Sequence, residues 1–234
     1  MDKKVHVMAI GAHAGDMELT CGGVLTKYAM EGHKVTLVHM TPGEKGHPTL
    51  TDEEYAIQKH KEAKEFADKI GAEVLMLPYK DGELEDTDEV KFYVCDIIRQ
   101  YKPDILITHW KNSMHKDHAA TYRIVQDAYF YAAIKSFKRD LPEHSVSGLY
   151  FAENWEDPYD FKPYIYMDVS SAYDRWMEAV KSYEFVCKSP YFKYLEYYSA
   201  LSVIRGAQCR KDKAEAFAVD PLSIKQVFQH FPVR

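Results

Sequence analysis

The feature that most constrains the fold is a regular alternation of short apolar runs with longer segments of helical periodicity in the first 137 residues. Short apolar runs rich in β-branched residues predict buried strands, whereas apolar residues spaced three and four apart predict helices. This order implies an α/β, Rossmann-like fold, a mostly parallel sheet with helices on both faces. The expected strands cover 5–10, 35–40, 74–77 and 104–108. The expected helices cover 19–31, 51–70 and 117–137, and a further helix begins at the Thr87 cap and precedes Pro103.

Beyond residue 141 the alternation loosens. Two further strands are expected over 148–151 and 165–169, followed by a helix over 171–188. Ser189 and Pro190 resemble the cap and first position of a last helix that ends near Gln208. Because the chain shows no internal repeat, low-complexity tract or long linker, residues 1–234 are predicted to form a single domain.

Composition excludes several classes of partner. The net charge is −6 and no block of Lys or Arg occurs, so nucleic acid is a poor candidate. The first apolar run ends at Ile10, too early for a signal peptide or a membrane span. The four cysteines are far apart and form no CxxC pair, which indicates reduced thiols. We therefore expect a cytoplasmic protein that contacts neither nucleic acid nor membrane.

Histidines and carboxylates gather where the predicted strands end. His13 and Asp16 follow the first strand, Glu44 follows the second, and His109 and 115–118 follow the fourth. In a parallel sheet these loops all emerge at the carboxyl edge, where open α/β folds bind their ligands. We therefore expect these side chains to meet in one crevice.

Three of these residues have the chemistry of a metal site. His13 and Asp16 lie three apart across a tight turn, and His118, with His115 three residues before it, offers a further imidazole. Two imidazoles and one carboxylate leave positions free for water and substrate, which is typical of catalytic zinc. The same ligands also hold Fe(II), so the spacing does not select the metal. A lone histidine at a strand end is more often structural, but the two clusters together favour a metal.

The two clusters resemble motifs of the LmbE-like, or PIG-L, family of zinc-dependent N-deacetylases. The family's AHPDD motif, followed after one residue by an acid, is similar to residues 12–18 (AHAGDME), and its HPDH motif is similar to residues 115–118 (HKDH). Weaker similarities, such as TPGE at 41–44 and AEAF at 214–217, extend along nearly the whole chain. The resemblance implies a Rossmann-like fold and hydrolysis of an N-acetyl group, usually on a glucosamine-containing sugar. It is also compatible with a homo-oligomer.

The resemblance also implies individual roles. By position in the motifs, His13, Asp16 and His118 would bind Zn²⁺. His115 would stabilise the oxyanion, and Asp117 would orient His115. In such a site zinc polarises the amide carbonyl and acidifies its bound water, while a cationic imidazole offsets the charge of the tetrahedral intermediate.

Gly15 departs from the family motif, because the family's expected general base is an aspartate at this position. Losing a positioned base costs about 10²–10⁴-fold in rate. Asp117 is the favoured replacement because it adjoins a metal ligand. Glu18 and Glu44 are alternatives, although Glu18 could instead support a ligand and Glu44 could contact the loop or the substrate. The departure leaves two other functions open: hydrolysis of another small amide, and binding of an acetamido sugar without turnover.

Other polar residues near the clusters have two interpretations each. Lys116 replaces the proline of the family motif, so it either favours an anionic substrate or is an exposed lysine at a helix start. His109 either contacts the substrate or makes a structural hydrogen bond. Trp155, in the acidic stretch 153–157, could rim the crevice and pack on a sugar ring.

Overall fold

The computed structural model describes residues 4–220. Its seven-stranded sheet has the order β3-β2-β1-β4-β5-β7-β6. The first five strands run parallel, while β7 pairs antiparallel with both β5 and β6. The predicted Rossmann-like α/β fold is confirmed. The strands are β1 (His6–His13), β2 (Lys34–Thr41), β3 (Glu73–Met76), β4 (Ile105–Thr108), β5 (Gly148–Ala152), β6 (Ile165–Asp168) and β7 (Ala214–Ala218).

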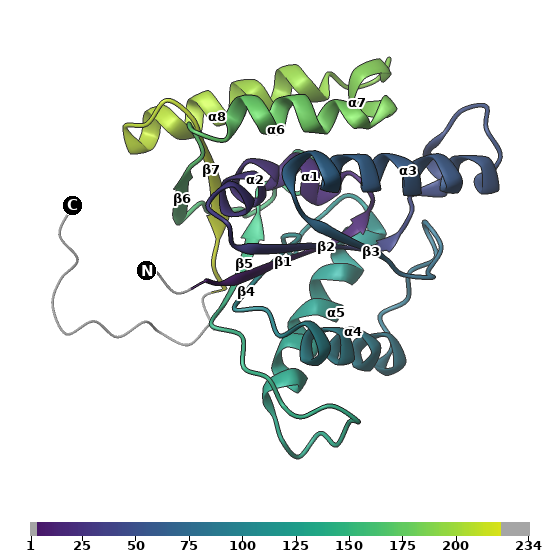
Figure 1. Ribbon diagram of the computed structural model, residues 1–234. Coiled ribbons are helices and arrows are strands. Elements are labelled where there is room, and N and C mark those ends of the chain that lie inside the picture. The colour runs from purple at the N-terminus through teal and green to yellow at the C-terminus, as the bar shows by residue number, and fades with distance from the viewer. Residues whose placement is uncertain (1–3, 221–234) are drawn as a thin grey trace, which may run out of the picture.

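Helices cover both faces of this sheet. Figure 1 shows α4 and α5 below it, α1 to α3 directly above it, and α6 and α8 in a further layer above those. The α-helices are α1 (Asp16–Thr20), α2 (Gly22–Met30), α3 (Asp52–Ile70), α4 (Asp88–Tyr101), α5 (Lys116–Ala133), α6 (Tyr173–Ala179), α7 (Glu184–Lys188) and α8 (Tyr194–Cys209), and the 3₁₀ helices are η1 (Glu44–Gly46) and η2 (Val180–Ser182).

Local signals explain where the long helices begin and end. The Thr51 hydroxyl accepts from the Glu54 N–H while the Glu54 carboxylate accepts from the Thr51 N–H, so α3 begins at a capping box. Gly71 ends α3 with φ 89°, a conformation that glycine adopts without strain. The Thr87 hydroxyl accepts from the Val90 N–H and so caps α4.

The last third of the chain differs from the prediction. The helix expected over 171–188 is broken into α6, η2 and α7, because Tyr183 leaves the helix in an extended conformation and buries its side chain. The last helix begins at Tyr194 rather than at Ser189 and Pro190. Strand β7 was not predicted, because its sequence AEAFA consists mainly of good helix formers. It is a strand because it fills the buried place between β5 and β6.

The first helix also differs from the expected 19–31. It begins at Asp16, directly after the strand, and breaks at Cys21 into α1 and α2. Both carboxylate oxygens of Glu215 on β7 accept hydrogen bonds from the Gly23 and Val24 N–H groups, at 2.7 and 2.8 Å. A carboxylate at the positive end of a helix is stabilising, so this contact joins the start of α2 to β7.

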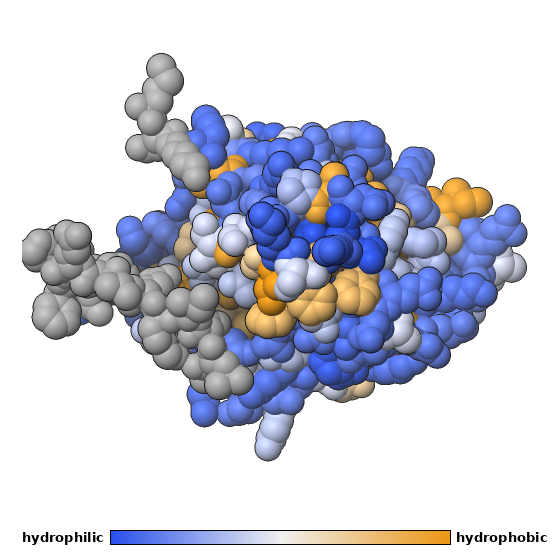
Figure 2. All heavy atoms as spheres, turned by 90° about the horizontal axis from the view of Figure 1, so that it is seen from below, coloured by the Kyte–Doolittle hydropathy of each residue, from blue (hydrophilic) through white to orange (hydrophobic). Residues whose placement is uncertain are grey.

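Apolar side chains pack on each face of the sheet, one cluster under α2, α3 and α6 and another over α4 and α5. The surface over α4 and α5 is mostly hydrophilic, with a small hydrophobic area near the centre of the view (Figure 2). Within residues 4–220 none of the helices combines the length and the apolarity that a membrane span requires.

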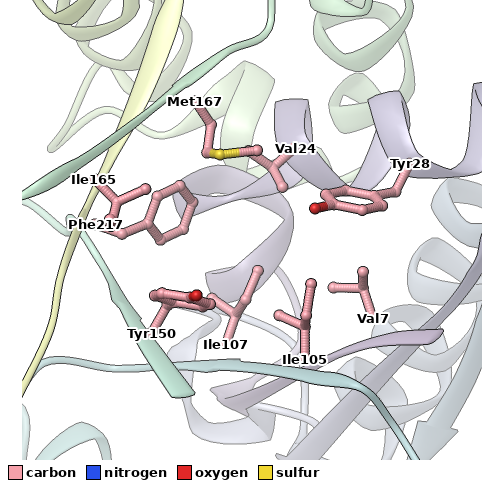
Figure 3. A pocket seen from close by; sticks show the side chains of 9 residues that line it. All are labelled: Val7, Val24, Tyr28, Ile105, Ile107, Tyr150, Ile165, Met167 and Phe217. Atoms are coloured by element: carbon pink, nitrogen blue, oxygen red, sulfur yellow. The ribbon is translucent and has the colours of Figure 1, made fainter. Parts of the chain in front are cut away.

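An apolar pocket of about 100 Å³ lies between the sheet and α2 (Figure 3). Only Tyr28 and Tyr150 bring polar atoms to its lining. Val7 and Ile105, near the amino ends of their strands, mark its position at the end of the sheet opposite His13. This apolar pocket is therefore separate from the cluster of histidines and carboxylates that the sequence predicts.

Candidate metal centre

The polar residues converge at the carboxyl ends of β1 and β4. After β1 the chain builds β2 and β3 on one side and then returns to place β4 on the other, so this point is the topological switch at which open α/β sheets bind ligands. His13 is the last residue of β1, and His109 directly follows β4. His118 lies in the first turn of α5, and Asp81 in the loop after β3.

The three predicted metal ligands face one another. Oδ2 of Asp16 lies 3.2 Å from Nδ1 of His13 and 3.3 Å from Nε2 of His118. His118 is 1% exposed and His13 is 9% exposed, so both imidazoles are largely shielded from water. Two imidazole nitrogens and a carboxylate are donors that suit Zn²⁺ and Fe(II). His115 is close enough to join His13 and His118 as a further ligand.

The outer nitrogen of each imidazole faces a carboxylate. Nε2 of His13 lies 3.1 Å from Oδ1 of Asp81 and 3.3 Å from Oδ2 of Asp117. Nδ1 of His118 lies 3.4 Å from Oδ1 of Asp157. A carboxylate at the outer nitrogen holds the proton there and leaves the inner lone pair for a metal. The surroundings of His13 and His118 therefore fit a bound cation.

The pKa shifts of the clustered residues also fit a bound cation. Burial alone would lower the pKa of His118, but the charge of Asp16 and the contact with Asp157 outweigh it and raise the pKa to about 10. Burial would also lower the pKa of His13, but the charge of Asp16 outweighs it and raises this pKa well above 6.5. Burial would raise the pKa of Asp16, but both imidazoles hold it well below its usual range. Without a metal, two imidazolium groups balance these carboxylates, and a cation would replace their protons.

His109 lies beneath the cluster and not in the crevice. It is 1% exposed, its Nε2 accepts a hydrogen bond from the Ala12 N–H at 2.9 Å, and its Nδ1 lies 3.5 Å from Oδ2 of Asp157. Its ring stacks on His118 with centroids 4.0 Å apart. Nε2 of His109 also lies 3.3 Å from Oδ2 of Asp16, so His109 contacts both the loop after β1 and the cluster.

His115 lies at the edge of the cluster and is half-buried. Its Nδ1 accepts the Asp117 N–H at 3.2 Å, so a neutral ring carries its proton on Nε2. Burial, together with the charges of His13 and His118, lowers the pKa of His115. The Asp117 carboxylate turns away from His115 and accepts the Gly82 N–H at 2.6 Å. The backbone N–H of Asp117 thus contacts His115, and within residues 4–220 the buried Oδ1 of Asp117 has no hydrogen-bond partner.

Three other predicted residues hold loops in place. Glu18 is fully buried, accepts the Gly15 N–H at 3.1 Å, and accepts the hydroxyl of Tyr183. The Glu44 carboxylate accepts the Asp81 N–H at 3.0 Å. Lys116 is exposed, and its ammonium donates to the Gly82 carbonyl at 3.0 Å. Of these three, Lys116 alone has an exposed side chain.

Sequence reasoning left several residues of the site without a role. Asp81 follows β3, so the rule that ligands gather at the carboxyl edge places it near the site but gives it no role, and Asp157 is one of several carboxylates that follow β5. Asn154 accepts the hydroxyl of Tyr198 at 3.0 Å and lies 3.5 Å from His118. Lys59, in the middle of α3, gave no local signal at all.

Three comparisons with known proteins agree with this geometry. The family model described as PIG-L, GlcNAc-PI de-N-acetylase, matches residues 8–129. A 4-oxalmesaconate hydratase of Pseudomonas putida is 22% identical over 88% of this chain and 81% of its own length. A 1D-myo-inositol 2-acetamido-2-deoxy-alpha-D-glucopyranoside deacetylase of Nocardioides is 26% identical over 58% of this chain, which spans 57% of that protein's length.

The fold has counterparts among solved structures. The N,N'-diacetylchitobiose deacetylase of Pyrococcus horikoshii superposes with a TM-score of 0.82 at 23% identity, covering 92% of this chain and 84% of that one. The family match extends from within β1 to within α5, a range that includes His13, Asp16 and His118. Since the family model covers more than half of the sequence, the chain belongs to the PIG-L family.

Proposed function

We propose that this protein is a metal-dependent hydrolase that removes the N-acetyl group of a small N-acetylglucosamine-type sugar or glycoside. The single observation that carries the proposal is the position of the Asp16 carboxylate between Nδ1 of His13 and Nε2 of His118. We assign the metal, Zn²⁺ or Fe(II), to these three residues. When bound there, the ion would polarise the amide carbonyl and lower the pKa of a water molecule.

The remaining residues of the site stabilise the charge that develops on the substrate and orient the metal ligands. His115 donates its Nε2 proton to the oxygen on which negative charge develops during attack on the carbonyl. Asp81 and Asp117 fix His13, and Asp157 fixes His118, so that the inner nitrogens keep their direction.

The sugar has room beside the cluster. An open groove of about 460 Å³ is lined by Trp155 and Glu156, and Oε2 of Glu156 lies 3.8 Å from Nδ1 of His118. An indole face packs well on the apolar face of a sugar ring. We therefore place the sugar against Trp155, with Lys116 at the rim, and infer that Glu44 and His109 affect the substrate only through the loops that they hold.

A second candidate is the addition of water to an unsaturated carboxylate. The relative that aligns with 88% of this chain is a hydratase, and the Gly15 position has no carboxylate for amide hydrolysis. Both reactions need an activated water, and we propose that the same three residues would hold the metal for either reaction. They differ in the group that receives the proton, a nitrogen in the deacetylase and a carbon in the hydratase.

The test begins with metal content, measured by plasma emission spectroscopy on wild type and His118→Ala purified identically without chelator. We expect about one zinc or iron per chain in wild type and a loss of it in the variant. Acetate release from N-acetylglucosamine and N,N'-diacetylchitobiose is then measured beside the loss of ultraviolet absorbance of an unsaturated dicarboxylate. Acetate release supports the deacetylase, and absorbance loss alone supports the hydratase. A wild type that binds no added metal would exclude both.

We propose a cytoplasmic location and homo-oligomerisation as well.

A further inference from the structure

The space beside Gly15 is filled by a residue from the other end of the chain. Gly15 has φ 112°, and a Cβ added there would lie 2.6 Å from Cζ and 2.8 Å from Cε1 of Phe185 on α7. Carbon atoms do not approach so closely, since their optimal separation is about 3.5–4.0 Å. The family's aspartate therefore cannot be accommodated at position 15 while Phe185 stays where it is.

A lysine lies next to the same space. Nζ of Lys59 is 3.7 Å from the position of that added Cβ and 4.0 Å from the centre of the Phe185 ring. The side chain comes from α3, yet Lys59 is only 4% exposed. A buried amine thus occupies the neighbourhood in which a carboxylate at position 15 would begin.

The amine is held mainly by aromatic rings. Nζ of Lys59 donates a hydrogen bond to the Ala14 carbonyl at 2.5 Å, and it lies 4.9 Å from the ring centre of Tyr183 and 5.6 Å from that of Tyr55. Within residues 4–220 no carboxylate forms a salt bridge with Lys59. An ammonium group has three N–H donors, so one acceptor leaves two of them to ring faces, which attract a cation.

Each carboxylate that was expected to act as the base already accepts a hydrogen bond from the protein. Glu18 accepts from the Gly15 N–H and Tyr183, and Glu44 accepts from the Asp81 N–H. Asp117 lies at Nε2 of His13, on the far side of the imidazole from Asp16. Each of the three therefore already holds a loop or His13, although Oδ1 of Asp117 has no hydrogen-bond partner within residues 4–220.

We propose that Lys59 is the proton-transfer group of this site in place of the missing carboxylate, and that Phe185 positions it. This inference rests on the proposed hydrolase function. The neutral amine takes one proton from the attacking water as its oxygen bonds to the carbonyl carbon and the carbonyl electron pair moves onto oxygen. The ammonium then returns that proton to the amide nitrogen as the C–N bond breaks. One water is consumed, and an acid and an amine are released.

The electrostatic surroundings support such a role. Burial lowers the pKa of Lys59 to about 8, although the charges of Glu62, Asp16, Glu18 and Asp81 oppose this shift. An amine with this pKa exchanges a proton near neutral pH, which an ordinary lysine does not. The groups that face it from other elements are the rings of Tyr183 and Phe185 and the carboxylates named above. A nearby metal cation would lower the pKa further by its charge.

The decisive comparison uses Lys59→Arg and Lys59→Met, with Lys61→Arg as the matched control, because Lys61 lies on the same helix and is exposed. Arginine keeps the charge but does not release its proton near neutral pH. We expect Lys59→Arg to lose about 10²–10⁴-fold in kcat while KM and metal content stay as in wild type. Wild-type activity should rise with pH through the titration of the amine, and this limb should be absent in Lys59→Arg. Full activity of Lys59→Arg would show instead that the charge alone is needed.

A second measurement does not depend on turnover. The Cε resonance of Lys59, assigned from the Lys59→Met spectrum of lysine-labelled protein, is followed against pH with and without zinc. A midpoint near 8 that falls when zinc is added, and that moves in Phe185→Leu, supports the proposal. A midpoint near 10.4 that zinc does not move overturns it, whatever substrate the protein turns over. If wild type binds metal but releases no acetate, the proposed deacetylase function fails. The pH titration of the Lys59 resonance still decides whether its amine has the predicted pKa.

Discussion

Nδ1 of His13 lies 3.2 Å from Oδ2 of Asp16, across a turn in which only Ala14 and Gly15 intervene. The same carboxylate oxygen accepts the backbone N–H of His13 at 2.7 Å. This bond fixes the Asp16 side chain relative to the end of β1 before any ligand is bound. The turn therefore presents a preformed pair of donors, which His118 completes from α5.

Metal binding is expected to release protons. The pKa of His118 is raised to about 10 and that of His13 is raised well above 6.5, so both imidazoles are protonated at pH 7 without metal. A cation must displace these protons, so affinity should fall as the pH is lowered, by about tenfold per pH unit for each proton displaced. Calorimetric titration with zinc in buffers of different ionisation enthalpy measures the number released. A buffer-independent heat would contradict the assignment of these two histidines as ligands.

Asp157 should matter for the metal although it does not contact it. Its Oδ1 lies 3.4 Å from Nδ1 of His118, and it is fully buried. Asp157→Asn should weaken zinc binding by about 10–100-fold, because the amide holds the imidazole less firmly in its ligating orientation. The matched control is Asp160→Asn, an exposed aspartate nearby that contacts Lys111 and Lys162. Competition with a chromogenic chelator measures both affinities, and equal values would show that Asp157 has no such role.

The residues of the site that could be predicted from the sequence follow from one physical rule. The loops of parallel strands meet at one edge of the sheet, so His13, Asp16 and His118 could be brought together without knowing any distance. Asp157 follows β5 by the same rule, but the sequence does not tell which carboxylate of the acidic stretch 153–157 turns inward. In the structure Asp157 is fully buried, whereas Glu156 remains partly exposed.

The part that could not be predicted depends on packing between distant segments. Lys59 lies on a helix whose charged residues predict a solvated face, and only the return of Phe185 and Tyr183 buries it. The break of the helix expected over 171–188 has the same origin, because Tyr183 leaves the helix to reach Glu18 on α1. Strand β7 was missed because local propensity favoured a helix and the buried place beside β5 decided otherwise.

Arg99 should contribute strongly to stability. It is 2% exposed and donates hydrogen bonds to four backbone carbonyls at and beyond the end of α5. The acceptors are Ala132, Tyr131, Ile134 and Leu141. Arg99→Met would leave these carbonyls buried without donors, and we expect a loss of about 3–5 kcal/mol in the free energy of unfolding.

Arg139→Met is the comparison for Arg99, because Arg139 pairs with Asp96 at the partly exposed surface. An exposed ion pair contributes about 0–1 kcal/mol, so the control should cost little. Urea unfolding followed by circular dichroism measures both variants. Losses of equal size would mean that the capping of α5 by Arg99 is unimportant.

The tightness of the space at Gly15 can be measured by a pair of glycine substitutions. Gly15 and Gly71 both have positive φ, 112° and 89°, but a Cβ at Gly71 would meet no atom within 4 Å. The backbone strain of Gly→Ala, about 1–3 kcal/mol, is common to both sites. Gly15→Ala should cost about 1–3 kcal/mol more than Gly71→Ala, because its Cβ must displace the Phe185 ring.

The source of that extra cost is tested by repeating both substitutions in a Phe185→Ala background. Removal of the ring should abolish the difference between Gly15→Ala and Gly71→Ala, and the double-mutant cycle gives the coupling between positions 15 and 185. Urea midpoints and slopes are compared across the five variants and wild type. An extra cost that persists without the Phe185 ring would assign it to the turn itself, and Phe185 would then have no part in excluding a side chain from position 15.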